Sequence, residues 1–79
     1  QQYDQALMYF TTCIELAKDN LLQVNPVKLA EYYMHRASIY EALGLMEHSQ
    51  MDLHHILEAD PNFIQRYHAQ VLQLEELGQ

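Results

Sequence analysis

Apolar residues recur at helical spacing along most of the chain. In the first such stretch they share one helical face: Ala6, Leu7, Phe10, Ile14 and Ala17. The same reasoning applied to the rest of the sequence predicts four helices, over residues 3–22, 26–43, 46–59 and 63–77. The pattern therefore indicates an all-α fold.

Helix-breaking residues separate these segments. Asn25 is a good N-cap and Pro26 fits the first position of a helix. Gly44 can adopt the left-handed conformation that ends a helix, and Pro61 interrupts the chain again. Because the linkers after residues 43 and 59 are short, neighbouring helices are expected to be antiparallel.

The sequence repeats itself in two registers. An offset of 34 residues places Tyr33 on Tyr67 and Gly44 on Gly78. An offset of 43 residues aligns three further pairs: Ala6 with Ser49, Phe10 with Leu53, and Cys13 with Ile56. Since 43 exceeds 34 by nine, the first junction carries a nine-residue insertion within residues 18–29. This segment is rich in helix formers, so we expect it to lengthen both flanking helices by about a turn.

Residues 30–63 resemble the tetratricopeptide repeat (TPR) family. The similarity rests on Tyr33, Ala37, Tyr40, Leu43, Gly44, Ser49, Leu53 and Pro61. The resemblance implies a fragment of a TPR-type helical-repeat solenoid with four antiparallel helices. Residues 1–22 would be the second helix of a preceding repeat with an extension, 30–63 a complete repeat, and 64–79 the first helix of a following repeat.

The family resemblance also implies a function. It indicates a non-catalytic module that binds a partner protein or peptide in a concave groove lined by the first helix of each pair. The groove residues would be Glu31, Met34, His35, Ser38, Glu41, Gln65, His68, Leu72 and Glu75. Their carboxylates favour a basic segment with apolar anchors. The alternative is a structural or self-associating segment of a larger assembly.

Composition narrows the range of partners. The 79 residues include 4 basic and 11 acidic side chains, a formal net charge of −7, which disfavours nucleic acid and anionic lipid. Apolar runs fall short of the roughly 18–20 residues that span a bilayer. The single Cys13 cannot form an internal disulfide, which suits a reducing compartment, so we expect a cytoplasmic protein. Homo-oligomerisation through exposed end helices is a further expectation.

Candidate chemistry is sparse. His54 and His55 are adjacent, so their side chains point about 100° apart on a helix. Both lie in the second helix of the repeat, which the family resemblance places on the outer side of the solenoid, where side chains are expected to be solvated. We therefore predict no metal site and no cofactor. Neither a nucleophile–base pair nor a phosphate-cradling glycine loop is present, so an enzyme is not expected.

The family resemblance also implies specific packing contacts. Relatives with an arginine at the position of Arg36 often have an acid in the facing helix, where Asp52 stands, so a structural ion pair is expected, with contact of Arg36 to a ligand as the alternative. Ala37 is expected at a tight helix contact. Four larger side chains are expected in the core: Phe10, Tyr40, Leu53 and Ile56.

Overall fold

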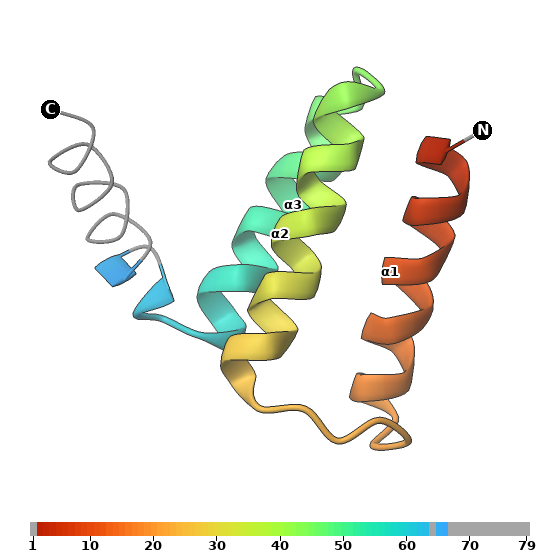
Figure 1. Cartoon of the computed structure of the whole chain (residues 1–79). Helices are drawn as coiled ribbons and strands as arrows, with labels where there is room; N and C mark the ends of the chain where they lie inside the picture. The colour runs from red at the N-terminus through yellow and green to blue at the C-terminus, as the bar shows by residue number, and fades with distance from the viewer. Residues whose placement is uncertain (1, 64, 67–79) are drawn as a thin grey trace, which may run out of the picture.

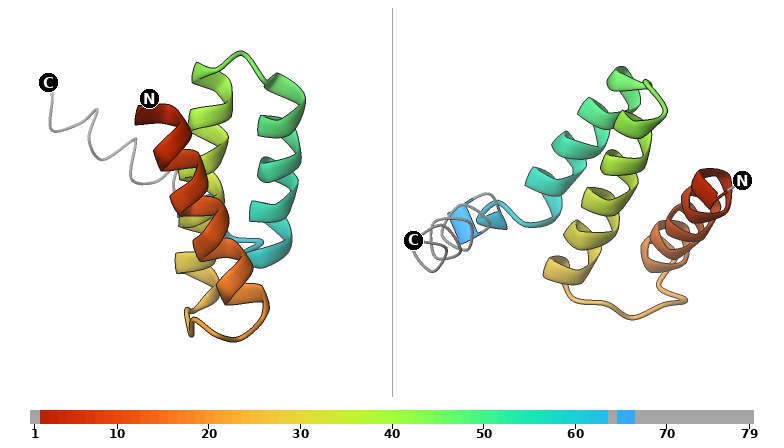
Figure 2. Two further views of the ribbon diagram at one scale, coloured as in Figure 1. Left: turned by 90° about the vertical axis from the view of Figure 1, so that its right-hand side faces the viewer. Right: turned by 45° about the horizontal axis from the view of Figure 1, so that its top comes forward.

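The computed structural model describes residues 2–63, 65 and 66, and these residues form three helices. Helix α1 is Gln2–Lys18, α2 is Pro26–Ala42 and α3 is Met46–Ala59. Successive helices run antiparallel (Figure 1). Helix α2 packs against both α1 and α3, and α2 and α3 form the closer pair (Figure 2). Most of the predicted fourth helix lies outside the described residues.

The ends of α2 follow the sequence signals closely. The Asn25 side chain accepts a hydrogen bond of 2.8 Å from the Lys28 N–H, and Pro26 opens the helix. At the other end Gly44 has φ = +77°, a left-handed conformation that glycine adopts without a steric penalty. The predicted N-cap and the predicted stop are both confirmed.

The insertion does not lengthen both helices. Helix α2 begins at Pro26, a turn before the repeat itself, as expected, but α1 ends at Lys18. Asn20 takes φ = 60°, and the N–H groups of Leu21 and Leu22 both donate to the carbonyl of Leu16, at 2.8 and 3.0 Å. The predicted extension of the first helix is therefore wrong. Asparagine tolerates the left-handed conformation, so the chain turns at Asn20, and the backbone N–H groups that follow it bond to a carbonyl of the last helical turn.

A small core forms where the three helices meet. Its buried members are Ile14 from α1, Ala30 and Tyr33 from α2, and Ile56 from α3. Ile56 and the tightly packed Ala37 are buried as predicted.

Three other core predictions fare less well. The prediction that Leu53 lies in the core is wrong, because 39% of the residue is exposed. The stripe of α3 that is buried comprises Ser49, Asp52 and Ile56, and Leu53 lies beside that stripe. Phe10 and Tyr40 are only partly buried.

Candidate partner-binding face

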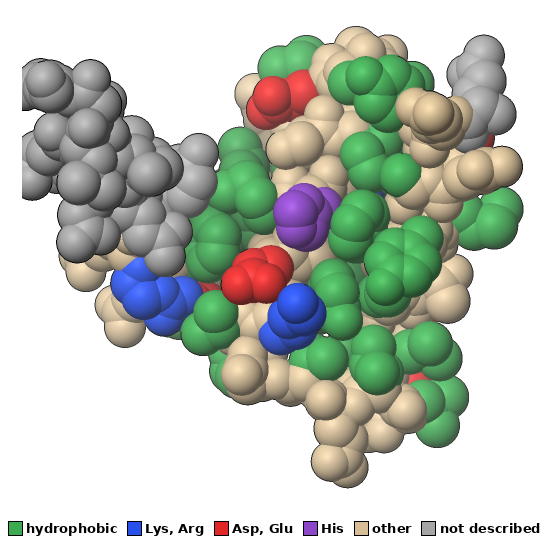
Figure 3. Space-filling view, in the orientation of Figure 1, with side chains coloured by type: hydrophobic (Ala, Val, Ile, Leu, Met, Phe, Trp, Pro, Cys, Tyr) green, Lys and Arg blue, Asp and Glu red, His purple; other side chains and the backbone are tan. Residues whose placement is uncertain are grey.

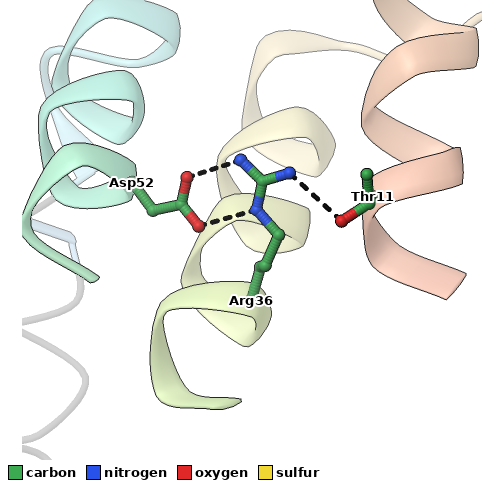
Figure 4. Close-up of polar contacts among 3 residues, drawn as sticks. All are labelled: Thr11, Arg36 and Asp52. Atoms are coloured by element: carbon green, nitrogen blue, oxygen red, sulfur yellow. Dashed lines mark hydrogen bonds and ion pairs between the residues drawn. The ribbon is translucent and has the colours of Figure 1, made fainter. Parts of the chain in front are cut away.

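Arg36 connects the three helices from its position on α2 (Figure 4). Its Nε–H donates to Asp52 Oδ2 at 2.7 Å and its Nη2–H to Asp52 Oδ1 at 2.6 Å, a bidentate pair between α2 and α3. Its Nη1–H donates to Thr11 Oγ1 on α1 at 3.3 Å. The side chains of Arg36 and Asp52 are 14% and 2% exposed, so the predicted ion pair is confirmed and is largely removed from water.

Two tyrosine rings complete the surroundings of this guanidinium. Its central carbon lies 5.6 Å from the ring centre of Tyr33 and 5.7 Å from that of Tyr40, within the range of cation–π attraction. Hydrogen bonding to Asp52 raises the pKa of Arg36. Burial raises the pKa of Tyr33. The Arg36 guanidinium thus makes its contacts within the protein and is poorly placed to contact a partner.

The predicted groove residues of α2 share one side of that helix, as their spacing requires. His35, Ser38 and Glu41 are exposed, whereas Glu31 and Met34 are partly buried. We call these five residues the α2 face. Gln65 is exposed in the short segment after α3, while His68, Leu72 and Glu75 lie outside the described residues. The space-filling view shows a histidine, an acidic and a basic side chain over α2 with hydrophobic groups beside them (Figure 3).

Two members of the α2 face also contact the body of the protein. The His35 ring stacks on Phe10 of α1, with centres 5.0 Å apart and planes inclined by 19°. Met34 packs against the core cluster. The α2 face therefore combines apolar side chains that pack against the rest of the protein with polar groups that are exposed to solvent.

The charges around this face are more balanced than the sequence suggested. Lys28 Nζ lies 3.5 Å from a carboxylate oxygen of Glu31, a basic neighbour that the sequence interpretation left out. Its i, i+3 spacing could have revealed it. Glu41 accepts a 3.3 Å hydrogen bond from the Ser49 hydroxyl of α3. Arg66, in the short segment after α3, pairs with Asp60.

The histidines of α3 have different surroundings. His54 is exposed as expected, but His55 is partly buried and its ring stacks on Tyr33 with centres 5.0 Å apart. The expectation of a solvated His55 is wrong, because that part of α3 turns toward α2. Within residues 2–63, 65 and 66, the His, Cys, Asp and Glu side chains form no group of three that could hold a metal ion. Helices long and apolar enough to cross a membrane are likewise absent from that part of the chain.

Comparison with known proteins agrees with this helical arrangement. The family model described as a tetratricopeptide repeat matches residues 30–63, which run from the second turn of α2 through all of α3 to Phe63. Searches of curated proteins and of solved structures gave no match. The resemblance seen in the sequence is confirmed: residues 30–63 are a tetratricopeptide repeat.

Proposed function

We propose that this chain is a non-catalytic module that binds a partner protein or peptide on the α2 face. Tetratricopeptide repeats generally mediate protein–protein interaction. The observation that carries the proposal is the position of α2. It is packed by α1 and α3, yet it leaves His35, Ser38 and Glu41 exposed between them. The proposal includes no cofactor and keeps the cytoplasmic location expected from the sequence.

The chemistry of the α2 face favours a partner segment that combines apolar and basic side chains. Met34 and the stacked rings of His35 and Phe10 offer apolar contact. Lys28 offsets Glu31, so the negative charge is concentrated at Glu41 near the carboxyl end of α2. The partial negative charge of a helix C-terminus adds to that of the carboxylate. A Lys or Arg of the partner would be placed beside Glu41, and the net charge of −7 opposes nucleic acid in this role.

The test uses peptides selected by this chain from a random displayed library. Enriched sequences should carry Lys or Arg beside apolar residues, and their affinity should fall as salt rises. The variant Glu41→Gln keeps an acceptor for Ser49 but removes the charge, and should weaken binding about fivefold, on the order of 1 kcal/mol. Glu47→Gln, an equivalent change at an exposed residue of α3, is the matched control. Equal affinity for both variants would refute binding at the α2 face.

A structural or self-associating role is the second candidate, and the exposed side of α3 favours it. Leu53 and Leu57 border a shallow hollow of about 200 Å³ together with Gln50 and His54. Exposed apolar surface of this kind can associate with a like surface. Sedimentation velocity over a concentration series should then show a dimer that Leu57→Glu abolishes. Monomers at every concentration would eliminate this role.

A further inference from the structure

The ammonium group of Lys28 lies near two side chains of its own helix. Its Nζ is 3.5 Å from a carboxylate oxygen of Glu31 and 5.8 Å from the ring centre of Tyr32. Both distances are long, since charge-assisted hydrogen bonds measure about 2.7–2.9 Å and cation–π attraction extends to about 6 Å. The Lys28 side chain is also 54% exposed, so water competes for its charge. A carboxylate and an aromatic ring thus form a cation site that the protein's own lysine fills loosely.

The ring of this cation site is held in position by the packing of α1 on α2. Tyr32 is partly buried against the core cluster, and its ring centre lies 6.4 Å from that of Phe10. Phe10 in turn stacks on His35 of the α2 face. The Glu31 side chain is 45% exposed. A cation from solution can therefore reach the carboxylate and the ring once Lys28 moves aside, and the ring needs no further ordering.

Arginine suits this site better than lysine does. A guanidinium is planar, so it can donate two hydrogen bonds to the Glu31 carboxylate and stack on the Tyr32 ring at the same time. The ammonium of Lys28 is a compact charge that makes neither arrangement. Displacement of Lys28 is cheap, because an exposed ion pair shifts an equilibrium by no more than about fivefold. An incoming arginine thus exchanges two weak contacts for stronger ones.

The second acidic residue of the α2 face sets a spacing. Glu41 follows Glu31 by ten residues, which is about 15 Å along a helix, and the apolar contacts of Met34 and His35 lie between them. In an extended segment every second side chain points the same way, in steps of about 6.6 Å. Residues four apart are then about 13 Å from each other, with a third midway. Basic, apolar and basic residues at alternate positions therefore match the α2 face.

We propose that the α2 face binds an extended segment whose arginine displaces Lys28 from Glu31 and Tyr32. An apolar residue two positions away contacts Met34, and a second Lys or Arg, four positions from the arginine, pairs with Glu41. Lys28 is an internal competitor that lowers the affinity for this segment. The proposal rests on the proposed function and adds to it the spacing of the partner's charges, the preference for arginine at one end and the autoinhibitory role of Lys28.

The experiment uses peptides that the chain selects from the random displayed library. Enriched sequences should carry an arginine four residues from a second Lys or Arg. One such peptide, and its analogue with uncharged citrulline in place of the arginine, are titrated with the chain and followed by fluorescence anisotropy. Lys28→Met should tighten binding of the arginine peptide about fivefold and change that of the citrulline peptide less than twofold. Glu31→Gln should weaken binding of the arginine peptide about fivefold.

Controls separate this proposal from the proposed function. Lys18→Met removes the same charge from an exposed residue of α1 and should leave both affinities unchanged. Circular dichroism should show equal helicity for all variants. Enrichment of peptides without the four-residue spacing, or an arginine peptide that Lys28→Met does not bind more tightly, would overturn the proposal. In both cases weaker binding by Glu41→Gln would still support the proposed function. Failure to select any peptide, or binding that neither variant changes, would contradict both.

Discussion

Removal of one member of the Arg36–Asp52 pair should destabilise the fold severely, whereas removal of both should not. Asp52→Leu leaves a guanidinium that is only 14% exposed without its counter-ion. Arg36→Met leaves a carboxylate that is 2% exposed without its two hydrogen bonds. The double variant replaces the pair by apolar groups of similar size, so that neither charge remains buried.

The expected magnitudes follow from this burial. Each single change should lower the free energy of unfolding by about 3–5 kcal/mol, the typical cost of an unpaired buried charge. A domain of 79 residues has a total stability of roughly 4–12 kcal/mol, so a single variant loses a large part of it. The double variant should lie close to the wild type, because apolar replacement of a buried ion pair is often neutral or stabilising. The coupling energy of the cycle, which is the sum of the two single losses when the double variant matches the wild type, should then be about 6–10 kcal/mol.

Urea unfolding followed by circular dichroism at 222 nm measures all four proteins. An osmolyte such as trimethylamine N-oxide, present in every sample, keeps the single variants folded at the start of the titration. Lys28→Ala provides the control, because its ion pair with Glu31 is 54% and 45% exposed and should contribute at most about 1 kcal/mol. A loss below about 1 kcal/mol for Asp52→Leu, equal to the exposed pair, would refute the claim that the Arg36–Asp52 pair is desolvated.

Three further predictions concern packing, backbone conformation and pH. Ile56→Ala should cost about 2–5 kcal/mol and Leu53→Ala less than about 1.5, because only Ile56 is fully buried; equal urea midpoints would contradict the observed register of α3. Gly44→Ala should cost about 1–2 kcal/mol through its φ of +77° alone, since no atom lies within 4 Å of the added Cβ, and Gly44→Asn should cost less. Thermal melts should therefore show a lower melting temperature for Gly44→Ala than for Gly44→Asn. Burial raises the pKa of Tyr33, so the folded state holds its phenol proton longer than the unfolded state and stability falls as pH rises above about 10. Tyr33→Phe should flatten this decline in melting temperature between about pH 9 and 11, and identical alkaline profiles would disprove it.

Local signals in the sequence predicted the helix boundaries well where one residue decides the backbone conformation. Asn25 and Gly44 act within a single turn, so their effect does not depend on the rest of the fold. The insertion was harder to predict, since its helix-forming residues compete with one asparagine at position 20 that turns left-handed. Propensities summed over a segment do not reveal which residue ends the helix.

The candidate site shows the same division between local and long-range information. Helical spacing was enough to place His35, Ser38 and Glu41 on one side of α2. The hydrogen bond from Arg36 to Thr11 depends on how α1 docks across α2, and no spacing rule gives that docking. The stacking of His55 on Tyr33 likewise depends on the angle between α2 and α3.

Amide chemical-shift mapping tests binding at the α2 face most directly. The isotope-labelled chain is titrated with the tightest peptide selected from the random library, and two-dimensional amide spectra are recorded at each addition. The largest shifts should fall on the α2 face, at Glu31, His35, Ser38 and Glu41. Shifts concentrated on α3 or on α1, with the α2 face unchanged, would contradict the proposed function.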